Sequence, residues 1–234
     1  MDIVTEFKKP LSSRVLFGLS IIFLIVVDLG LLIYRFVYSG SLNNWYLAWN
    51  LLLGALPLLF SYLYFINTSA KNLFTYKALL LIFLWILFLP NAFYLISDLV
   101  HLQESSNKMI VYDAVMFSAF GITGILLGFL SLALIHFRFK SLPKKYSYFL
   151  VVLSLFISSY AIYLGRYLRW NSWDVITNPF GIIFDISNSL IDYHKFIKSL
   201  GTTLLFFTLL IALYFVFWSG VLFVKDLQKK RVLK

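Results

Sequence analysis

Residues 79–89 read LLLIFLWILFL, an unbroken apolar run. A strand of a membrane β-barrel would alternate apolar and polar residues at every second position, and this run does not alternate. Only helices and closed barrels satisfy all their backbone hydrogen bonds inside a bilayer, so the run predicts a membrane-spanning helix. Residues 90–102 follow directly as PNAFYLISDLVHL, which brings amide, carboxylate and imidazole groups to one end of that helix.

The same pattern recurs along the 234 residues, of which 61% are hydrophobic and only 13% charged. A soluble domain is roughly 45–50% apolar and about 25% charged, so this excess exceeds what one water-soluble core can bury. About 20 apolar residues in a helix cross a bilayer. Segments of this kind lie at residues 14–37, 45–66, 77–99, 111–137, 146–168 and 199–224. We predict an all-α, polytopic transmembrane bundle of about six spans, with residues 1–234 forming a single integral membrane domain.

The positions of the basic residues predict how the bundle is oriented. The net charge is +10, and most Lys and Arg residues lie in four segments: 1–14, 67–77, 138–145 and 225–234. The others are Arg35, Lys108, Arg166, Arg169, Lys195 and Lys198. Cytoplasmic loops carry the excess of Lys and Arg, so both termini are predicted to be cytoplasmic, in the plasma (inner) membrane. The first segment is too long for the apolar part of a signal peptide and is expected to be retained. No basic face with interleaved aromatics lies outside the spans, which argues against nucleic-acid binding.

The longest connector, 171–198, carries a helix start at Asn178 and Pro179. Its apolar positions recur near helical spacing but are too few to span a bilayer. We predict an interfacial helix on the outer surface, or alternatively a loop packed over the mouth of the bundle.

With this orientation, polar side chains gather at the outer ends of four spans, of which the second begins in NNWYLAWN at 43–50. A stripe on the third span has spacings of three, four and three residues: Asn91, Tyr94, Asp98 and His101. Pro90 precedes the stripe and predicts a kink. The fourth span begins near Asp113, and the fifth ends in LGRYLRWNSWD at 164–174. Ionisable groups inside a membrane usually face the bundle interior or a water-filled cavity.

The polar clusters have structural as well as functional interpretations. Trp170 and Trp173 are typical of a membrane-interface belt. Buried arginine–aspartate pairs often serve packing rather than chemistry. Asp98 and His101 could hold a divalent ion together with Asp113, but a pair spaced by three residues is a weak signal, and a hydrogen-bond network at a helix end is the preferred interpretation. We predict no metal and no cofactor. Gly121, Gly124, Gly128 and Ser131 form a small-residue face that predicts close helix packing.

The functional interpretation uses the same residues. Arg166 and Arg169 are predicted to clamp a phosphate or carboxylate. Asp98, His101 and Asp113 are the candidate acid–base residues if a substrate lies between them. The remaining predicted ligand-binding residues are Asn91, Trp170, Trp173 and Asp174. The chain has no cysteine, Gly-rich phosphate loop or HExxH motif, which excludes thiolate chemistry and argues against ATP-driven chemistry.

Four stretches also carry a family resemblance: LFLPNAFYLISDLVHL at 87–102, YD at 112–113, GFLSLALIHF at 128–137 and LGRYLRWNSWDVITNP at 164–179. They resemble the domain of unknown function 1361 family of bacterial membrane proteins, over roughly residues 45–220. The resemblance implies a multi-pass membrane architecture and no particular activity, ligand or catalytic residue.

Three functions remain open at this point, and the sequence does not decide whether the chain is an enzyme. The first is an outer-leaflet site that binds, or also processes, an anionic lipid-linked or envelope ligand. The second is a small transporter in which Asp28, Asp98 and Arg166 line a pathway. The third is a non-enzymatic assembly subunit that docks a protein partner through residues 171–198. Membrane lipid is an expected partner in each case.

Overall fold

A computed structural model describes residues 12–69 and 72–232, and these ranges contain helices and no strand. Six helices are long and apolar enough to cross a membrane: Val15–Ser39, Tyr46–Asn67, Tyr76–Glu104, Ile110–Phe139, Lys144–Leu168 and Tyr193–Gln228. The predicted all-helical fold with six spans is therefore confirmed. The third span is longer than the predicted 77–99, because the chain stays helical to Glu104.

The chain divides into two units, one ending at Ala48 and the other beginning at Trp49. The first unit contains α1, Ser13–Ser39. The Ser12 hydroxyl accepts a hydrogen bond from the Val15 N–H (3.4 Å) and so caps the start of α1. The helix ends at Gly40, whose φ of 63° is a left-handed conformation that glycine adopts without steric cost.

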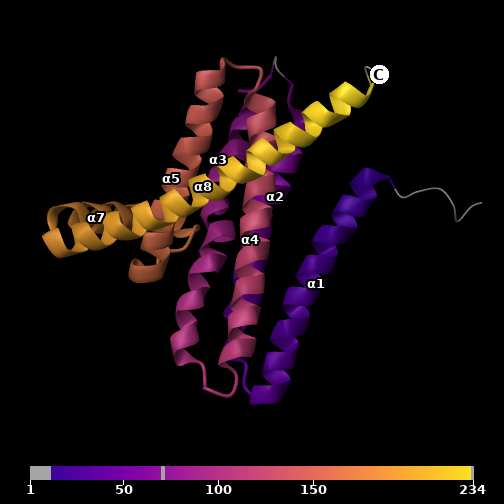
Figure 1. Cartoon of the computed structure of the whole chain (residues 1–234). Coiled ribbons are helices and arrows are strands. Elements are labelled where there is room, and N and C mark those ends of the chain that lie inside the picture. The colour runs from indigo at the N-terminus through magenta and orange to yellow at the C-terminus, as the bar shows by residue number, and fades with distance from the viewer. Residues whose placement is uncertain (1–11, 70–71, 233–234) are drawn as a thin grey trace, which may run out of the picture. The chain divides into compact units, whose positions relative to one another are not determined.

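The second unit contains most of α2 and all later elements, whose helices are labelled in Figure 1 where there is room. Their bounds are α2 Tyr46–Asn67, α3 Tyr76–Tyr94, η2 Leu95–Glu104, α4 Ile110–Phe139, α5 Lys144–Leu168, α6 Asp174–Thr177, α7 Pro179–Ile191 and α8 Tyr193–Val232. In Figure 1, α3 and η2 run beside α4 as an antiparallel pair, and α8 crosses α4 and α5 obliquely, packing against both.

The apolar core of this unit lies where α3, α4, α5 and α8 meet. Its buried members include Trp85, Leu89, Phe93, Phe129, Leu132, Leu155, Leu210, Tyr214 and Trp218. Aromatic rings fill much of it: the ring of Phe129 lies 5.6 Å from that of Phe93 and 5.4 Å from that of Tyr214. Burying such side chains away from the lipid gains dispersion contacts, which drive helix association where no water is expelled.

The small-residue face of α4 packs directly on the junction between α3 and η2. A Cβ atom on Gly121 would lie 2.7 Å from the Ile96 side chain, and one on Gly124 would meet the carbonyl oxygen of Ala92. Ser131, further along the same face, accepts a hydrogen bond from the Trp85 indole (3.3 Å). The packing face predicted from the glycine spacing is confirmed.

The connector between α5 and α8 contains the predicted helix, α7, which runs beside the first part of α8 in Figure 1. Asn178 caps it by accepting from the Gly181 N–H (3.1 Å), and Pro179 occupies the first turn. Ser189 faces inward, 3.2 Å from the Tyr163 hydroxyl, whereas Phe180 is 83% exposed. A helix with apolar side chains exposed in this way has the character of an interfacial helix, which stays a prediction.

Candidate functional site

The polar stripe of the third span lies on a change of helix type. The α-helix continues through Pro90 to Tyr94, and a 3₁₀-helix then runs for ten residues, Leu95–Glu104. Runs of 3₁₀-helix are usually only three or four residues long, and longer stretches often mark functional positions. Because a 3₁₀-helix has three residues per turn, Asp98, His101 and Glu104 lie on one edge of η2.

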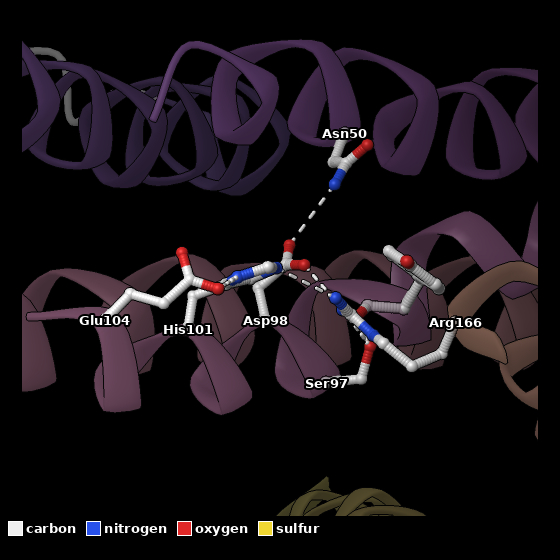
Figure 2. Close-up of polar contacts among 7 residues, drawn as sticks. Asn50, Ser97, Asp98, His101, Glu104 and Arg166 are labelled. Atoms are coloured by element: carbon white, nitrogen blue, oxygen red, sulfur yellow. Dashed lines mark hydrogen bonds and ion pairs between the residues drawn. The ribbon is translucent and has the colours of Figure 1, made fainter. Parts of the chain in front are cut away.

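Arg166, near the end of α5, reaches across to this edge and pairs with Asp98 (Figure 2). Its Nη2 lies 2.6 Å from Asp98 Oδ1 and donates also to Ser97 Oγ at 2.6 Å. The second oxygen of Asp98, Oδ2, accepts from Asn50 Nδ2 of α2 at 3.2 Å. Both carboxylate oxygens of Asp98, which is only 1% exposed, therefore have a hydrogen-bond donor.

The other terminal nitrogen of Arg166 continues the hydrogen-bonded chain toward the surface. Arg166 Nη1 lies 3.0 Å from His101 Nε2, and His101 Nδ1 lies 3.2 Å from Glu104 Oε1. Arginine has no acceptor atom, so His101 Nε2 must accept and Nδ1 must carry the proton that is donated to Glu104. We call the six residues Asn50, Ser97, Asp98, His101, Glu104 and Arg166 the Asp98–Arg166 network.

Side-chain exposure rises along this network in one direction. It is 1% for Asp98, 16% for Arg166, 28% for His101 and 78% for Glu104. The network thus connects a buried ion pair to an exposed carboxylate.

Two further contacts fix the guanidinium in place. It lies 4.4 Å above the centre of the Tyr94 ring, a cation–π distance. Gly165 permits this arrangement, since a Cβ atom there would lie 3.0 Å from Tyr94 Cε2. Within the described residues, the Nε of Arg166 is buried without a hydrogen-bond partner, so the guanidinium retains unused donor capacity.

The structure places several other predicted site residues in contacts around the α5–α7 connector. Asn91 donates to Ser172 Oγ (2.7 Å) and thereby ties α3 to this connector. The Trp170 indole donates to Asp185 of α7 (2.9 Å), and Trp173 makes an edge-on contact with Trp49, with ring centres 6.4 Å apart.

Asp174 has a role within the connector itself. Its Oδ2 accepts from the backbone N–H of Asn171 at 2.7 Å, and its Oδ1 accepts from the Thr177 hydroxyl at 3.3 Å. These bonds close the turn that begins α6. Like Asn91, Trp170 and Trp173, Asp174 shapes the connector beside the Asp98–Arg166 network.

Arg169 does not share the position of Arg166. The α-helix ends at Leu168, and Arg169 follows with a φ of 61°, a left-handed conformation that favours glycine and costs a bulkier residue about 1 kcal/mol. Its side chain is exposed, while Arg166 is directed into the network. Arg166 is the arginine whose hydrogen bonds join it to the network, and a clamp formed together with Arg169 stays a prediction.

Asp113 is 1% exposed in the first turn of α4, where the helix dipole favours a carboxylate. One turn later on the same helix, the ring of Phe117 lies 6.4 Å from that of His101. No group of three or more His, Asp or Glu side chains suited to hold a metal ion occurs among residues 12–69 and 72–232.

Sequence reasoning did not single out Asn50, Ser97 or Glu104. A signal existed for two of them. Asn50 is an amide within the second span that directly precedes the apolar run LLLGALPLLF, and Glu104 follows His101 by one 3₁₀ turn. Ser97 carries no such signal, because its role depends on the approach of Arg166 from α5.

The fold and the network define a multi-pass helical membrane protein with a buried ion pair in its bundle. The model of the family described as "Protein of unknown function (DUF1361)" matches residues 49–213, and the chain belongs to this family. All six residues of the Asp98–Arg166 network lie within the matched range. No curated protein and no solved structure matches the chain.

Proposed function

We propose that this multi-pass membrane protein binds an anionic group of a lipid-linked or envelope ligand, at the outer leaflet of the plasma membrane, through Arg166. The observation that carries the proposal is the Arg166–Asp98 ion pair, 2.6 Å long, inside an apolar bundle. Ionisable groups at membrane depth are costly and are a default indication of a functional site. In this proposal Asp98 occupies the position on Arg166 that the ligand's phosphate or carboxylate takes when it binds.

The chemistry of arginine supports an anion as the ligand. Its planar guanidinium offers five N–H donors and matches phosphate and carboxylate groups. Arg166 uses Nη1 and Nη2 within the network, and its Nε has no partner among the described residues. Tyr94 and Gly165 hold the guanidinium, so little ordering is required when an anion arrives.

The arrangement supports binding better than acid–base catalysis. A general base needs a free lone pair, and the lone pair on His101 Nε2 is occupied by Arg166. Arginine stays protonated in proteins, so no proton passes through it from Asp98 to His101. The proposal therefore assigns Arg166 to anion binding, with His101 as a positioning residue and Asp98 as the internal carboxylate that the ligand displaces.

Removing the charge of Asp98, which competes with the ligand for Arg166, tests this assignment. Asp98→Asn keeps the shape of the side chain but removes its charge, so Arg166 should bind added phosphate about tenfold more tightly than in the native chain. The measurement is the thermal unfolding midpoint in detergent against phosphate concentration, since a ligand that binds the folded state raises it. Native mass spectrometry of the same samples should show more retained anionic lipid in Asp98→Asn.

The charge-neutral double variant Asp98→Asn/Arg166→Gln is the matched comparison. It should lose the phosphate response of Asp98→Asn while remaining folded, because neither partner of the ion pair is left behind as an uncompensated charge. An undiminished response in the double variant would overturn the assignment of Arg166, and a native-like response in Asp98→Asn would overturn competition by Asp98.

The outer position of the site predicts a labelling pattern. Ser106 is exposed in the loop between η2 and α4, at the network's end of the bundle, and Ser141 is exposed in the loop between α4 and α5. The chain has no cysteine, so each can be replaced singly by cysteine in a clean background. A membrane-impermeant maleimide added to intact cells should label Ser106→Cys and leave Ser141→Cys unlabelled. The reverse pattern would contradict an outer-leaflet ligand.

A further inference from the structure

A second charged site lies at the opposite end of α4 from Asp113. Two lysines from different elements, Lys140 after α4 and Lys225 on α8, approach the same aromatic ring. Lys140 Nζ lies 4.9 Å and Lys225 Nζ lies 5.9 Å from the ring centre of Phe137. The two ammonium groups are therefore within about 11 Å of each other, close to the Debye length at physiological salt.

A fixed aromatic platform holds Lys140 in this position. Its Nζ also lies 4.7 Å from the ring centre of Trp218, which is 4% exposed. Trp218 in turn stacks on His136 with ring centres 4.0 Å apart. Both rings are buried in the bundle, so the contact with Trp218 holds the ammonium group of Lys140 against a packed surface.

No carboxylate balances these charges in the part of the chain that the structure describes. Asp226 follows Lys225 in sequence, yet neither lysine forms an ion pair with it or with any other described acidic residue. Partial burial, and then the charges of Lys225 and Lys144, lower the pKa of Lys140. An anion between α4, α5 and α8 would relieve this repulsion.

We propose that Lys140 and Lys225, with Lys144 beside them, bind the phosphate headgroup of an anionic phospholipid at the membrane surface. The location favours lipid as the source of the phosphate: Lys140 directly follows the fourth span and Lys144 is the first residue of the fifth, so both lie at span ends. Tryptophan and lysine at such a position are typical of contacts with headgroups. This site lies at the far end of a 30-residue helix from Asp113, about 40 Å away, and does not depend on the proposed ligand of Arg166.

The test uses the full chain in nanodiscs of phosphatidylcholine, with and without 30 mol% phosphatidylglycerol. Phosphatidylglycerol should raise the thermal unfolding midpoint of the native chain, and Lys140→Gln/Lys225→Gln should lose most of this increase. In native mass spectrometry the double variant should retain phosphatidylglycerol about tenfold less, since each lysine near an anionic headgroup contributes severalfold to binding.

Lys195→Gln/Lys198→Gln is the matched control, because it removes two exposed lysines at the opposite end of α8. It should keep the phosphatidylglycerol response. A response of equal size in both double variants would overturn the site. Equal stabilisation of the native chain by inorganic phosphate in detergent would overturn a lipid headgroup as the source of the phosphate.

Discussion

Arg166→Gln is expected to lower the free energy of unfolding by about 3–5 kcal/mol, because it leaves the buried carboxylate of Asp98 without its counter-charge. Asp98 is 1% exposed, and in the native chain its Oδ1 accepts from Arg166 at 2.6 Å. In the variant, the Asn50 amide, at 3.2 Å from Asp98 Oδ2, still donates to this carboxylate. One neutral amide does not offset the cost of holding a carboxylate away from water.

Asp98→Asn should cost less than Arg166→Gln. Arg166 is 16% exposed and keeps its contacts with His101 and Tyr94, so its charge retains partners and some access to the surface. The double variant Asp98→Asn/Arg166→Gln should recover much of the stability lost in Arg166→Gln, because replacing both partners of a buried pair is far milder than removing one.

Thermal unfolding of the four proteins in one detergent, followed by tryptophan fluorescence, completes a double-mutant cycle. Lys195→Gln removes one exposed positive charge at the same end of the bundle and should leave the midpoint unchanged. If Arg166→Gln unfolded at the native midpoint, or the double variant were no more stable than Arg166→Gln, the ion pair would not stabilise this bundle.

The spans could be predicted because bilayer thickness sets their length and lipid sets their composition. The change from α-helix to 3₁₀-helix at Leu95 could not be predicted in this way. Spacings of three, four and three residues indicated an α-helical stripe, whereas the 3₁₀-helix aligns Asp98 with Glu104. The junction lies under the glycine face of α4, and a contact between segments that far apart in sequence is not encoded in either one alone.

The positions of Arg166 and Arg169 at a helix end also could not be predicted from the sequence alone. Three residues apart, they would share one face if the α-helix continued. The helix ends at Leu168, and Arg169 follows it in a left-handed conformation with an exposed side chain. The partners of Arg166 lie 65 to 69 residues earlier in the chain, so the sequence indicated that charge was present without indicating which group it would meet.

Gly124→Ala is the second substitution with a large expected effect, a loss of about 2–3 kcal/mol or more in the free energy of unfolding. Its Cβ atom would meet the carbonyl oxygen of Ala92 and lie 2.8 Å from Leu95 Cδ1. The carbonyl group of Ala92 is part of the α3 backbone and cannot rotate aside as a side chain can. Accommodating the methyl group therefore requires α4 to move away from the junction of α3 and η2.

Alanine substitutions at two other glycines should reduce the stability less than Gly124→Ala does. A Cβ atom on Gly128 would lie 2.5 Å from a ring carbon of Phe93, which can tilt, so Gly128→Ala should cost less than Gly124→Ala. A Cβ atom on Gly220 of α8 would have no neighbour within 4 Å, so Gly220→Ala should be neutral or stabilising by up to about 1 kcal/mol. Thermal midpoints in one detergent should follow the order Gly220→Ala, Gly128→Ala, Gly124→Ala from highest to lowest.

The glycine substitutions also test the Asp98–Arg166 network, because Ser97 and Asp98 lie within one turn of Leu95 on η2. Displacing α4 from this junction should shift the edge of η2 that carries the network. Gly124→Ala should therefore weaken the coupling between Asp98 and Arg166 in the double-mutant cycle, whereas Gly220→Ala should leave it unchanged. If Gly124→Ala were as stable as Gly220→Ala and the coupling were intact, the glycine face could not be what sets the approach of α4 to η2.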